Sequence, residues 1–486
     1  MSTSLAAAPG RARLLWLIAA GLVIGLNLAA LGARLGRVAP LNPWEPALVC
    51  DAWRAAHGRA VYADPLLDHA TVMYGPLWPH LLGGLVRVGL PADLRLPRAA
   101  VLLAAAGLVF LLARATRRPG SPPLAGLALL LAPSFPCASY YVEARPDLPA
   151  LLAAAAALLC LWRGETGRRR AVWAWGLGLL VLAGSLKQTM LAAGAVPLVA
   201  VIVERRPLRA ALGWVLPPLG LVLALPPLLR LLAPQVYHYA FAVPAAYPLE
   251  PGPAALALLE GASRAPLPLA LLALQLLRPR RSAPPGWGRR PAPPGWGLAL
   301  AAALVAWPLG AVAATKPGGD ANSHLPLLLS GAAYALLRLP AVWPRAAGRP
   351  LLAGLLAGLL LLGALREPVR SWRFAFHAAH GDATRPAAIE ALRGRPGPGA
   401  CPDDPALLLA ATGEPGRSLI AEKDADGWRR RVPPGVVEEL RRARWVVTVH
   451  GTWPLSLPPP LLRELGFAPG PLPGTSPAYV LWARAE

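Results

Sequence analysis

Long apolar segments, separated by short polar connections, are the feature of this sequence that most limits how it can fold. The first extends from Leu14 to Leu35, long enough to cross a hydrocarbon core of about 30 Å as a helix and too long for the core of a signal peptide. We therefore predict an α-helical integral membrane protein with about eleven transmembrane helices. The ten further segments are residues 97–114, 122–137, 147–163, 171–185, 189–203, 209–232, 265–278, 296–314, 325–339 and 350–365.

The overall composition agrees with a membrane protein. Hydrophobic residues make up 55% of the 486 positions and charged residues 15%, whereas a soluble domain has roughly 25% charged residues. A formal net charge of +23 would suggest a nucleic-acid partner in a soluble chain. Here, however, arginines separate apolar segments, as in proteins whose membrane orientation they fix. We expect no nucleic-acid partner.

The arginine-rich connections alternate along the chain, which predicts its orientation. The positive-inside rule places them in the cytoplasm together with the N-terminus. An odd number of spans then places the C-terminus on the outer face, so we expect a multi-pass protein of the cell inner (plasma) membrane. The connections are residues 114–118, 163–170, 204–209, 278–290 and the loop with Arg338, Arg345 and Arg349.

Two segments outside the spans have a structure of their own. The long first external loop, residues 37–96, contains the apolar stretch 73–90. Counting this stretch as a span would place the arginine-rich "RATRR" connection on the outer side of the membrane. We therefore expect a helix lying on the outer surface, with a true span as the alternative. After residue 365, charges of both signs appear, and "RWVVTVH" and "AYVLWARA" alternate like strands around the helix-like "PPPLLRELG". We predict a transmembrane domain, 1–365, and a small extracytoplasmic α/β domain, 366–486.

Two acids follow the first span on the predicted outer face. Glu45 and Asp51 lie where a lipid head group would be, and a carboxylate there could deprotonate an incoming hydroxyl group. The alternative is a solvated loop whose acids balance nearby arginines.

Cationic and polar residues occur in two further outer connections. Arg145 offers a planar fork to phosphate oxygens, whereas Asp147 opens the next helix and could simply cap it. Lys187, one of three lysines in the chain, precedes Gln188 in a short connection. It could hold a lipid phosphate, or its ammonium group could extend to the interface as many lysines do.

The external loop 315–326 carries Asp320, Asn322 and His324 at alternate positions. These side chains could contact sugar hydroxyls, or the loop could be a polar turn. Metal ligation by Glu143, Asp147, Asp320 and His324 has no supporting spacing. The sequence requires no cofactor and leaves a divalent metal open.

Taken in order, these motifs resemble those of membrane glycosyltransferases of the C superfold, the group that includes protein O-mannosyltransferases and aminoarabinose transferases, with uncharacterised bacterial relatives. The likeness covers about residues 10–365. Many relatives carry an Asp-Glu pair after the first helix, whereas this chain has "WEP" with Asp51 six residues later, so both acids stay candidates. The matching motifs are the acid Glu45, the run Gly58 to Asp64, "YGPL" with Tyr74, "RPD" at 145–147, "KQT" at 187–189 and "GGDAN" at 318–322.

The resemblance implies a membrane enzyme that takes a sugar from a polyprenyl-phosphate donor and passes it to a glycan, lipid or protein acceptor on the outer face. Glu45 or Asp51 would be the general base, and Arg145 and Lys187 would hold the donor phosphate. Asp147, Asn322 and His324 would orient the sugar or the acceptor, and direct displacement would invert the anomeric carbon. Two alternatives remain: a transporter or flippase for a lipid-linked sugar, and a non-catalytic receptor or assembly protein.

Overall fold

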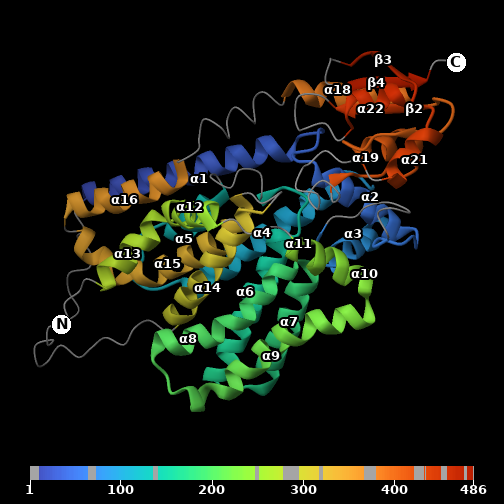
Figure 1. Cartoon of the computed structure of the whole chain (residues 1–486). Helices are drawn as coiled ribbons and strands as arrows, with labels where there is room; N and C mark the ends of the chain where they lie inside the picture. The colour runs from blue at the N-terminus through green and yellow to red at the C-terminus, as the bar shows by residue number, and fades with distance from the viewer. Residues whose placement is uncertain are drawn as a thin grey trace, which may run out of the picture.

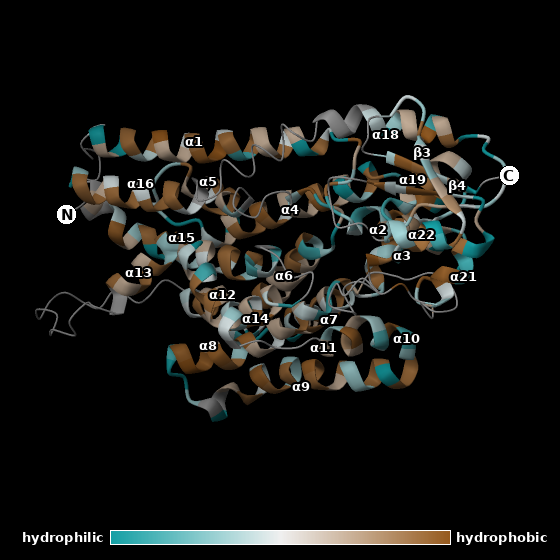
Figure 2. Cartoon of the chain, turned by 45° about the horizontal axis from the view of Figure 1, so that its top comes forward, coloured by the Kyte–Doolittle hydropathy of each residue, from teal (hydrophilic) through white to brown (hydrophobic). Residues whose placement is uncertain are grey.

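The computed structural model describes residues 10–63, 73–134, 141–246, 251–276, 295–316, 321–347, 349–365, 379–420, 432, 434–449, 457–475 and 479–484. Figure 1 shows a large bundle of helices with a smaller part of mixed helices and strands at one end. In Figure 2 the bundle is largely hydrophobic, whereas the smaller part carries more hydrophilic residues.

Two long apolar helices and two short helices between them form the first part of the chain. Helix α1 (Gly10–Leu35) and helix α4 (Arg95–Thr116) are long enough to cross a membrane. Between them lie α2 (Trp44–Ala56) and α3 (Leu77–Arg87), which pack against each other. The 11 residues of α3 extend about 17 Å, which is too short for a hydrocarbon core of about 30 Å. This length agrees with the predicted surface helix rather than with a span.

The remaining helices run back and forth through the bundle. Their bounds are α5 (Ala125–Leu131), η1 (Ala132–Ser134), α6 (Asp147–Thr166), α7 (Arg170–Leu186), η3 (Gln188–Ala195), α8 (Val196–Glu204), α9 (Leu208–Leu232), α10 (Pro234–Tyr237), η4 (His238–Ala242), α11 (Val243–Ala245), α12 (Pro251–Ser263), α13 (Pro266–Leu276), α14 (Trp296–Ala314), η5 (Ala321–His324), α15 (Leu325–Ala347) and α16 (Pro350–Leu365).

Six of the described helices are long and apolar enough to cross a membrane, or up to seven if α12 and α13, bent by 82° at their junction, form one broken span. Three shorter apolar helices accompany them, Arg170–Leu186, Gln188–Glu204 and Pro350–Gly363. The expected count of eleven stays a prediction. The expected segment 122–137 is helical only to Ser134 in the described residues.

Chain direction separates two ends of the bundle. Helix α6 begins at Asp147, and the chain returns through α7 to Lys187 before η3 and α8 lead away again. The predicted outer connections therefore lie at one end, together with α2, α3 and the C-terminal part (Figure 2). The arginine-rich connections after α6 and after α8 lie at the other end. This is the separation that the charge pattern predicts, while the side of the membrane on which each terminus lies stays a prediction.

The C-terminal part is a small sheet with helices on both faces. Strand β1 (Gly399–Ala400) is parallel to β2 (Trp445–Val449), and β4 (Tyr479–Arg484) is antiparallel to both β2 and β3 (Phe467–Pro471). Trp445 and Val447 face helices α18 (Ala379–Leu392) and α19 (Pro405–Thr412). The intervening Val446 faces α21 (Pro434–Arg442) and α22 (Pro459–Glu464). The predicted strands and the helix between them correspond to β2, β4 and α22.

This C-terminal part packs against helix α2. Ala406 and Leu409 of α19 form a buried cluster with Val49 and Cys50. Burial raises the pKa of the Cys50 thiol to about 12, so this cysteine stays protonated at neutral pH. Arg54 of α2 also donates a hydrogen bond to the carbonyl oxygen of Gly416, at 3.0 Å. Helix α2 is thus held between the bundle and the C-terminal part.

Candidate active site

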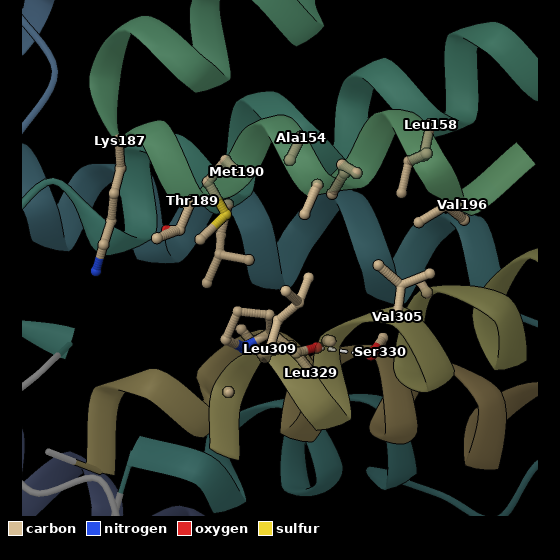
Figure 3. Close-up of a pocket in the computed structure, with 18 of the residues that line it drawn as sticks. Ala154, Leu158, Lys187, Thr189, Met190, Val196, Val305, Leu309, Leu329 and Ser330 are labelled. Atoms are coloured by element: carbon tan, nitrogen blue, oxygen red, sulfur yellow. Dashed lines mark hydrogen bonds between the residues drawn. The ribbon is translucent and has the colours of Figure 1, made fainter. Parts of the chain in front are cut away.

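A cavity of about 660 Å³ extends between helices α4, α6, α14 and α15 and the segment η3–α8. In Figure 3, Ala154, Leu158 and Met190 project from one wall toward Val305 and Leu309 on the other. Lys187 stands at one end of this space. The cavity therefore joins an apolar interior to a charged end.

The charged end gathers residues from three separate connections. Arg145 and Asp147 come from the start of α6, Lys187 from the junction of α7 and η3, and Lys316 and Asn322 from the residues around η5. These residues are far apart in the sequence, and the alternating helix direction brings them together.

Asp147 lies in the first turn of α6, where a negative charge is favourable beside the positive end of the helix dipole. Its Oδ1 pairs with Nζ of Lys187 and accepts a hydrogen bond from Nδ2 of Asn322, at 3.0 Å. Its Oδ2 is buried and has no hydrogen-bond partner within the described part of the chain. Asp147 therefore joins two predicted binding residues and keeps one acceptor oxygen unused.

Arg145 is buried, and its orientation is fixed from two sides. Its guanidinium carbon lies 4.1 Å from the centre of the Trp44 ring, a stacking geometry that suits arginine. Its Nε lies 3.3 Å from Oε2 of Glu143. The preceding carbonyl, that of Ala144, accepts a hydrogen bond of 2.8 Å from Nε1 of Trp78 in α3. The short helices α2 and α3 thereby position the arginine.

Lys187, Gln188 and Tyr74 also border the cavity. Gln188 donates from Nε2 to the carbonyl oxygen of Met73 at 2.9 Å, and its Oε1 is buried without a hydrogen-bond partner among the residues described. Nζ of Lys187 lies 5.8 Å from the centre of the Tyr74 ring. Gly75 permits this approach, because a Cβ at that position would lie 2.2 Å from the carbonyl oxygen of Ser185. The "YGPL" motif thus packs against the end of α7.

Lys316 is a site residue that the sequence did not single out. Its Nζ donates a hydrogen bond of 2.6 Å to the carbonyl oxygen of Pro244, and burial lowers its pKa below the ordinary value of 10.5. The signal for it was present, because lysine is rare in this chain and Lys316 lies in the external loop 315–326 that was predicted to contact sugar hydroxyls.

Five basic side chains and one acidic side chain line the cavity within the described residues. The acid is Asp147, and the bases are Arg118, Arg145, Arg163, Lys187 and Lys316. Arg163 stands near the end of α6, sixteen residues after Asp147, so the two are separated by about 24 Å along the helix. The cavity is thus positively charged and extends through most of the length of a span.

Glu45, a predicted base, is fully buried outside the cavity lining. Its two carboxylate oxygens accept hydrogen bonds from Arg98 at 3.1 and 2.6 Å. They also accept the backbone N–H groups of Leu41 and Ala144, at 2.7 and 3.0 Å. The fully buried Arg98, an arginine inside the predicted span 97–114, was missed as a site residue. Because Ala144 precedes Arg145, this ion pair holds the loop that carries the cavity arginine.

Asp51, the other predicted base, is also buried. It lies 3.5 Å from Arg54 and outside the cavity lining. The pKa of the nearby Tyr62 is raised, chiefly by burial and also by the negative charge of Asp51. The carboxylate is therefore buried near Arg54 and Tyr62, away from the cavity lining.

The predicted polar residues of the external loop 315–326 lie only partly at the cavity. Asn322 lines the cavity, whereas His324 is buried beside Gly261 and Gly310, outside the lining. Asp320 lies outside the described residues. No group of three or more histidine, cysteine, aspartate or glutamate residues suited to a metal ion occurs among the residues that were described.

No protein-family model matches this chain, and no curated protein matches it by sequence. A solved structure does resemble it, the crystal structure of ArnT from Cupriavidus metallidurans bound to undecaprenyl phosphate. The two structures have a TM-score of 0.55 and 14% sequence identity, over 96% of this chain and 98% of the other. The chain therefore has the fold of that protein over nearly its whole length.

Proposed function

We propose that this protein is a membrane glycosyltransferase that moves a sugar from a polyprenyl-phosphate donor to a glycan, lipid or protein acceptor. The observation that carries the proposal is the single cavity that joins a cationic end to a long apolar interior. A polyprenyl-phosphate sugar matches this arrangement, because it has a hydrocarbon tail, an anionic phosphate and a polyhydroxylated head.

The cationic end suits the phosphate. Arg145, Lys187 and Lys316 border the same space, and only Asp147 opposes their charge among the described lining residues. Charge-assisted hydrogen bonds from such groups bind phosphate oxygens and stabilise the charge that develops when the phosphate leaves.

Two acceptor atoms at this end suit a sugar. Oδ2 of Asp147 and Oε1 of Gln188 are both buried and lack a hydrogen-bond partner among the described side chains and backbone. A buried acceptor without a donor costs about 1–3 kcal/mol. A phosphate dianion has no hydrogen to donate, whereas sugar and acceptor hydroxyl groups do. The pair therefore favours a hydroxylated ligand over a bare lipid phosphate.

The fold supports the donor class. The structurally similar ArnT was crystallised with undecaprenyl phosphate, a lipid with a long hydrocarbon tail and a phosphate head. The opposing walls, with Ala154 and Leu158 on one side and Val305 and Leu309 on the other, offer such a tail an apolar path (Figure 3).

The proposed reaction is a direct displacement that inverts the anomeric carbon, for which the sequence suggests either Glu45 or Asp51 as the general base. It takes place on the outer face of the inner membrane, with the N-terminus in the cytoplasm and the C-terminal domain, residues 366–486, outside. The proposal includes no cofactor, because the sequence requires none, and it leaves a divalent metal open.

A transporter of lipid-linked sugars is the second candidate. Arg118 and Arg163 line the end of the cavity away from Lys187, so one continuous space extends toward both ends of the bundle. A flippase would use such a path to carry the head group across the membrane.

The two functions are separated by one assay. The purified protein is placed in lipid nanodiscs with a radiolabelled polyprenyl-phosphate hexose, and release of labelled sugar to water or to added acceptors is followed. We expect release by the wild type, strong loss in Lys187→Ala, and no change in Arg441→Ala, which removes an exposed cation of the C-terminal part. Absence of release, combined with faster lipid equilibration across vesicles than in empty ones, would favour the transporter.

A further inference from the structure

Asp147 has surroundings that neither predicted base has. Among the described residues that line the cavity it is the only acid, and it lies beside the cations that are proposed to hold the phosphate. Glu45 and Asp51 are buried outside that lining. We infer that Asp147 is the general base of the transfer and that its Oδ2 receives the proton of the acceptor hydroxyl group. The inference rests on the proposed function.

The two oxygens of Asp147 are not equivalent. Oδ1 is fixed by Lys187 and by Asn322, which orient the carboxylate. Oδ2 is buried and has no donor among the described residues. A buried carboxylate oxygen needs a donor, and the hydroxyl group of an acceptor supplies one. Oδ2 is therefore the oxygen that would take the proton when an acceptor hydroxyl group reaches it.

Glu45 differs in this respect. Both of its oxygens are occupied, by Arg98 and by the N–H groups of Leu41 and Ala144. Transfer of a proton to Glu45 would weaken a fully buried ion pair with Arg98, and it would disturb the loop that carries Arg145. The geometry suits Glu45 to positioning, and it suits Asp147 to proton transfer.

The proposed step is balanced within the cavity. The proton of the acceptor hydroxyl group moves to Oδ2 of Asp147 while the acceptor oxygen forms a bond to the anomeric carbon. The bond between that carbon and the phosphate oxygen breaks, and its electron pair stays on polyprenyl phosphate. Lys187 is in contact with Asp147, and the proposed phosphate position would place it beside the leaving oxygen as well. No oxidant, reductant or further reactant is needed.

Azide as the acceptor tests the assignment, because azide attacks carbon without losing a proton. We expect Asp147→Asn to lose about 100-fold or more in transfer to hydroxyl acceptors, the usual size of a general-base contribution. With azide, the same variant is expected to form glycosyl azide at a rate close to that of the wild type. Glu45→Gln is expected to be impaired equally with both acceptors, as a positioning residue would be.

Binding of unglycosylated polyprenyl phosphate is measured in parallel to check that each variant folds. If Asp147→Asn binds this lipid but stays inactive with azide, Asp147 acts through Lys187 and is not the base. If azide restores Glu45→Gln instead, Glu45 is the base. Both outcomes overturn the assignment while leaving the glycosyltransferase in place. A wild type that transfers sugar to neither acceptor would instead contradict the proposed function.

Discussion

Arg98 and Glu45 form a fully buried ion pair that was visible to sequence analysis only as an isolated acid and an arginine in a predicted span. Charge at such a depth is costly unless it is paired. The sequence predicted that Glu45 matters, because an acid after the first span has few reasons to be there. It could not supply the partner, since Arg98 is 53 residues away and the pairing depends on how α2 packs beside α4.

Replacing Arg98 tests the structural role of this pair. We expect Arg98→Met to destabilise the protein by about 3–5 kcal/mol, because Glu45 would be left buried and charged without its partner. Thermal unfolding in detergent, followed by circular dichroism, measures the loss. The double variant Arg98→Met with Glu45→Gln is expected to recover much of it. Equal stability of Arg98→Met and the wild type would show that the pair contributes nothing.

Lys316 predicts a pH dependence. Burial disfavours its charged form and lowers its pKa, whereas a bound phosphate favours that form. In the free protein Lys316 therefore loses its proton below pH 10.5, the ordinary value, and binding at alkaline pH must take a proton up. We expect the affinity for polyprenyl phosphate to fall as the pH rises through the lowered pKa. Titration calorimetry measures it, and a Lys316→Met variant with the same alkaline loss would exclude Lys316 as the cause.

For the helices as elements, the length of the apolar segments and the charge pattern predicted where most of them lie, but not their local hydrogen-bond geometry. Helices α4, α6, α9, α14 and α15 occupy predicted spans, and α3 is the short helix expected in the outer loop. The segment 189–203 was expected to be a plain span, but it begins as the 3-10 helix η3 of 8 residues. Hydropathy does not distinguish hydrogen-bond patterns, so this difference could not be predicted. Runs of this kind longer than three or four residues are uncommon.

Contact between the "YGPL" turn and the end of α7 gives an element-scale prediction. Gly75→Ala would place a Cβ 2.2 Å from the carbonyl oxygen of Ser185, which is backbone and cannot move aside cheaply. We expect a loss of stability of about 1–3 kcal/mol, typical of overpacking, and weaker binding of polyprenyl phosphate as Lys187 shifts. Gly84→Ala in α3 is the matched control, because nothing lies within 4 Å of its Cβ. Equal stability and equal lipid binding of the two variants would argue against the close approach of Gly75 to Ser185.

On the scale of the whole molecule, the C-terminal part is joined to the site through α2. Leu409 packs in the cluster between α19 and α2, whereas Leu407 belongs to the internal core of the C-terminal part. We expect Leu409→Asp to separate this part from the bundle while leaving it folded, and Leu407→Asp to unfold it. Limited proteolysis distinguishes the two variants. We expect cleavage confined to the connection between the bundle and the C-terminal part, residues 366–378, in Leu409→Asp, and cleavage throughout the C-terminal part in Leu407→Asp. Protection of that connection in Leu409→Asp would mean that other contacts suffice.

We propose that one cavity holds both parts of the donor lipid, the phosphate at its Lys187 end and the hydrocarbon tail along α6 and α14. The most direct measurement is an electron cryomicroscopy structure of the protein in nanodiscs with polyprenyl phosphate. We expect density for the phosphate within hydrogen-bond distance of Lys187 and Arg145, with the tail against Leu158 and Val305. Lipid density at another surface, with no phosphate at Lys187 and Arg145, would contradict the account.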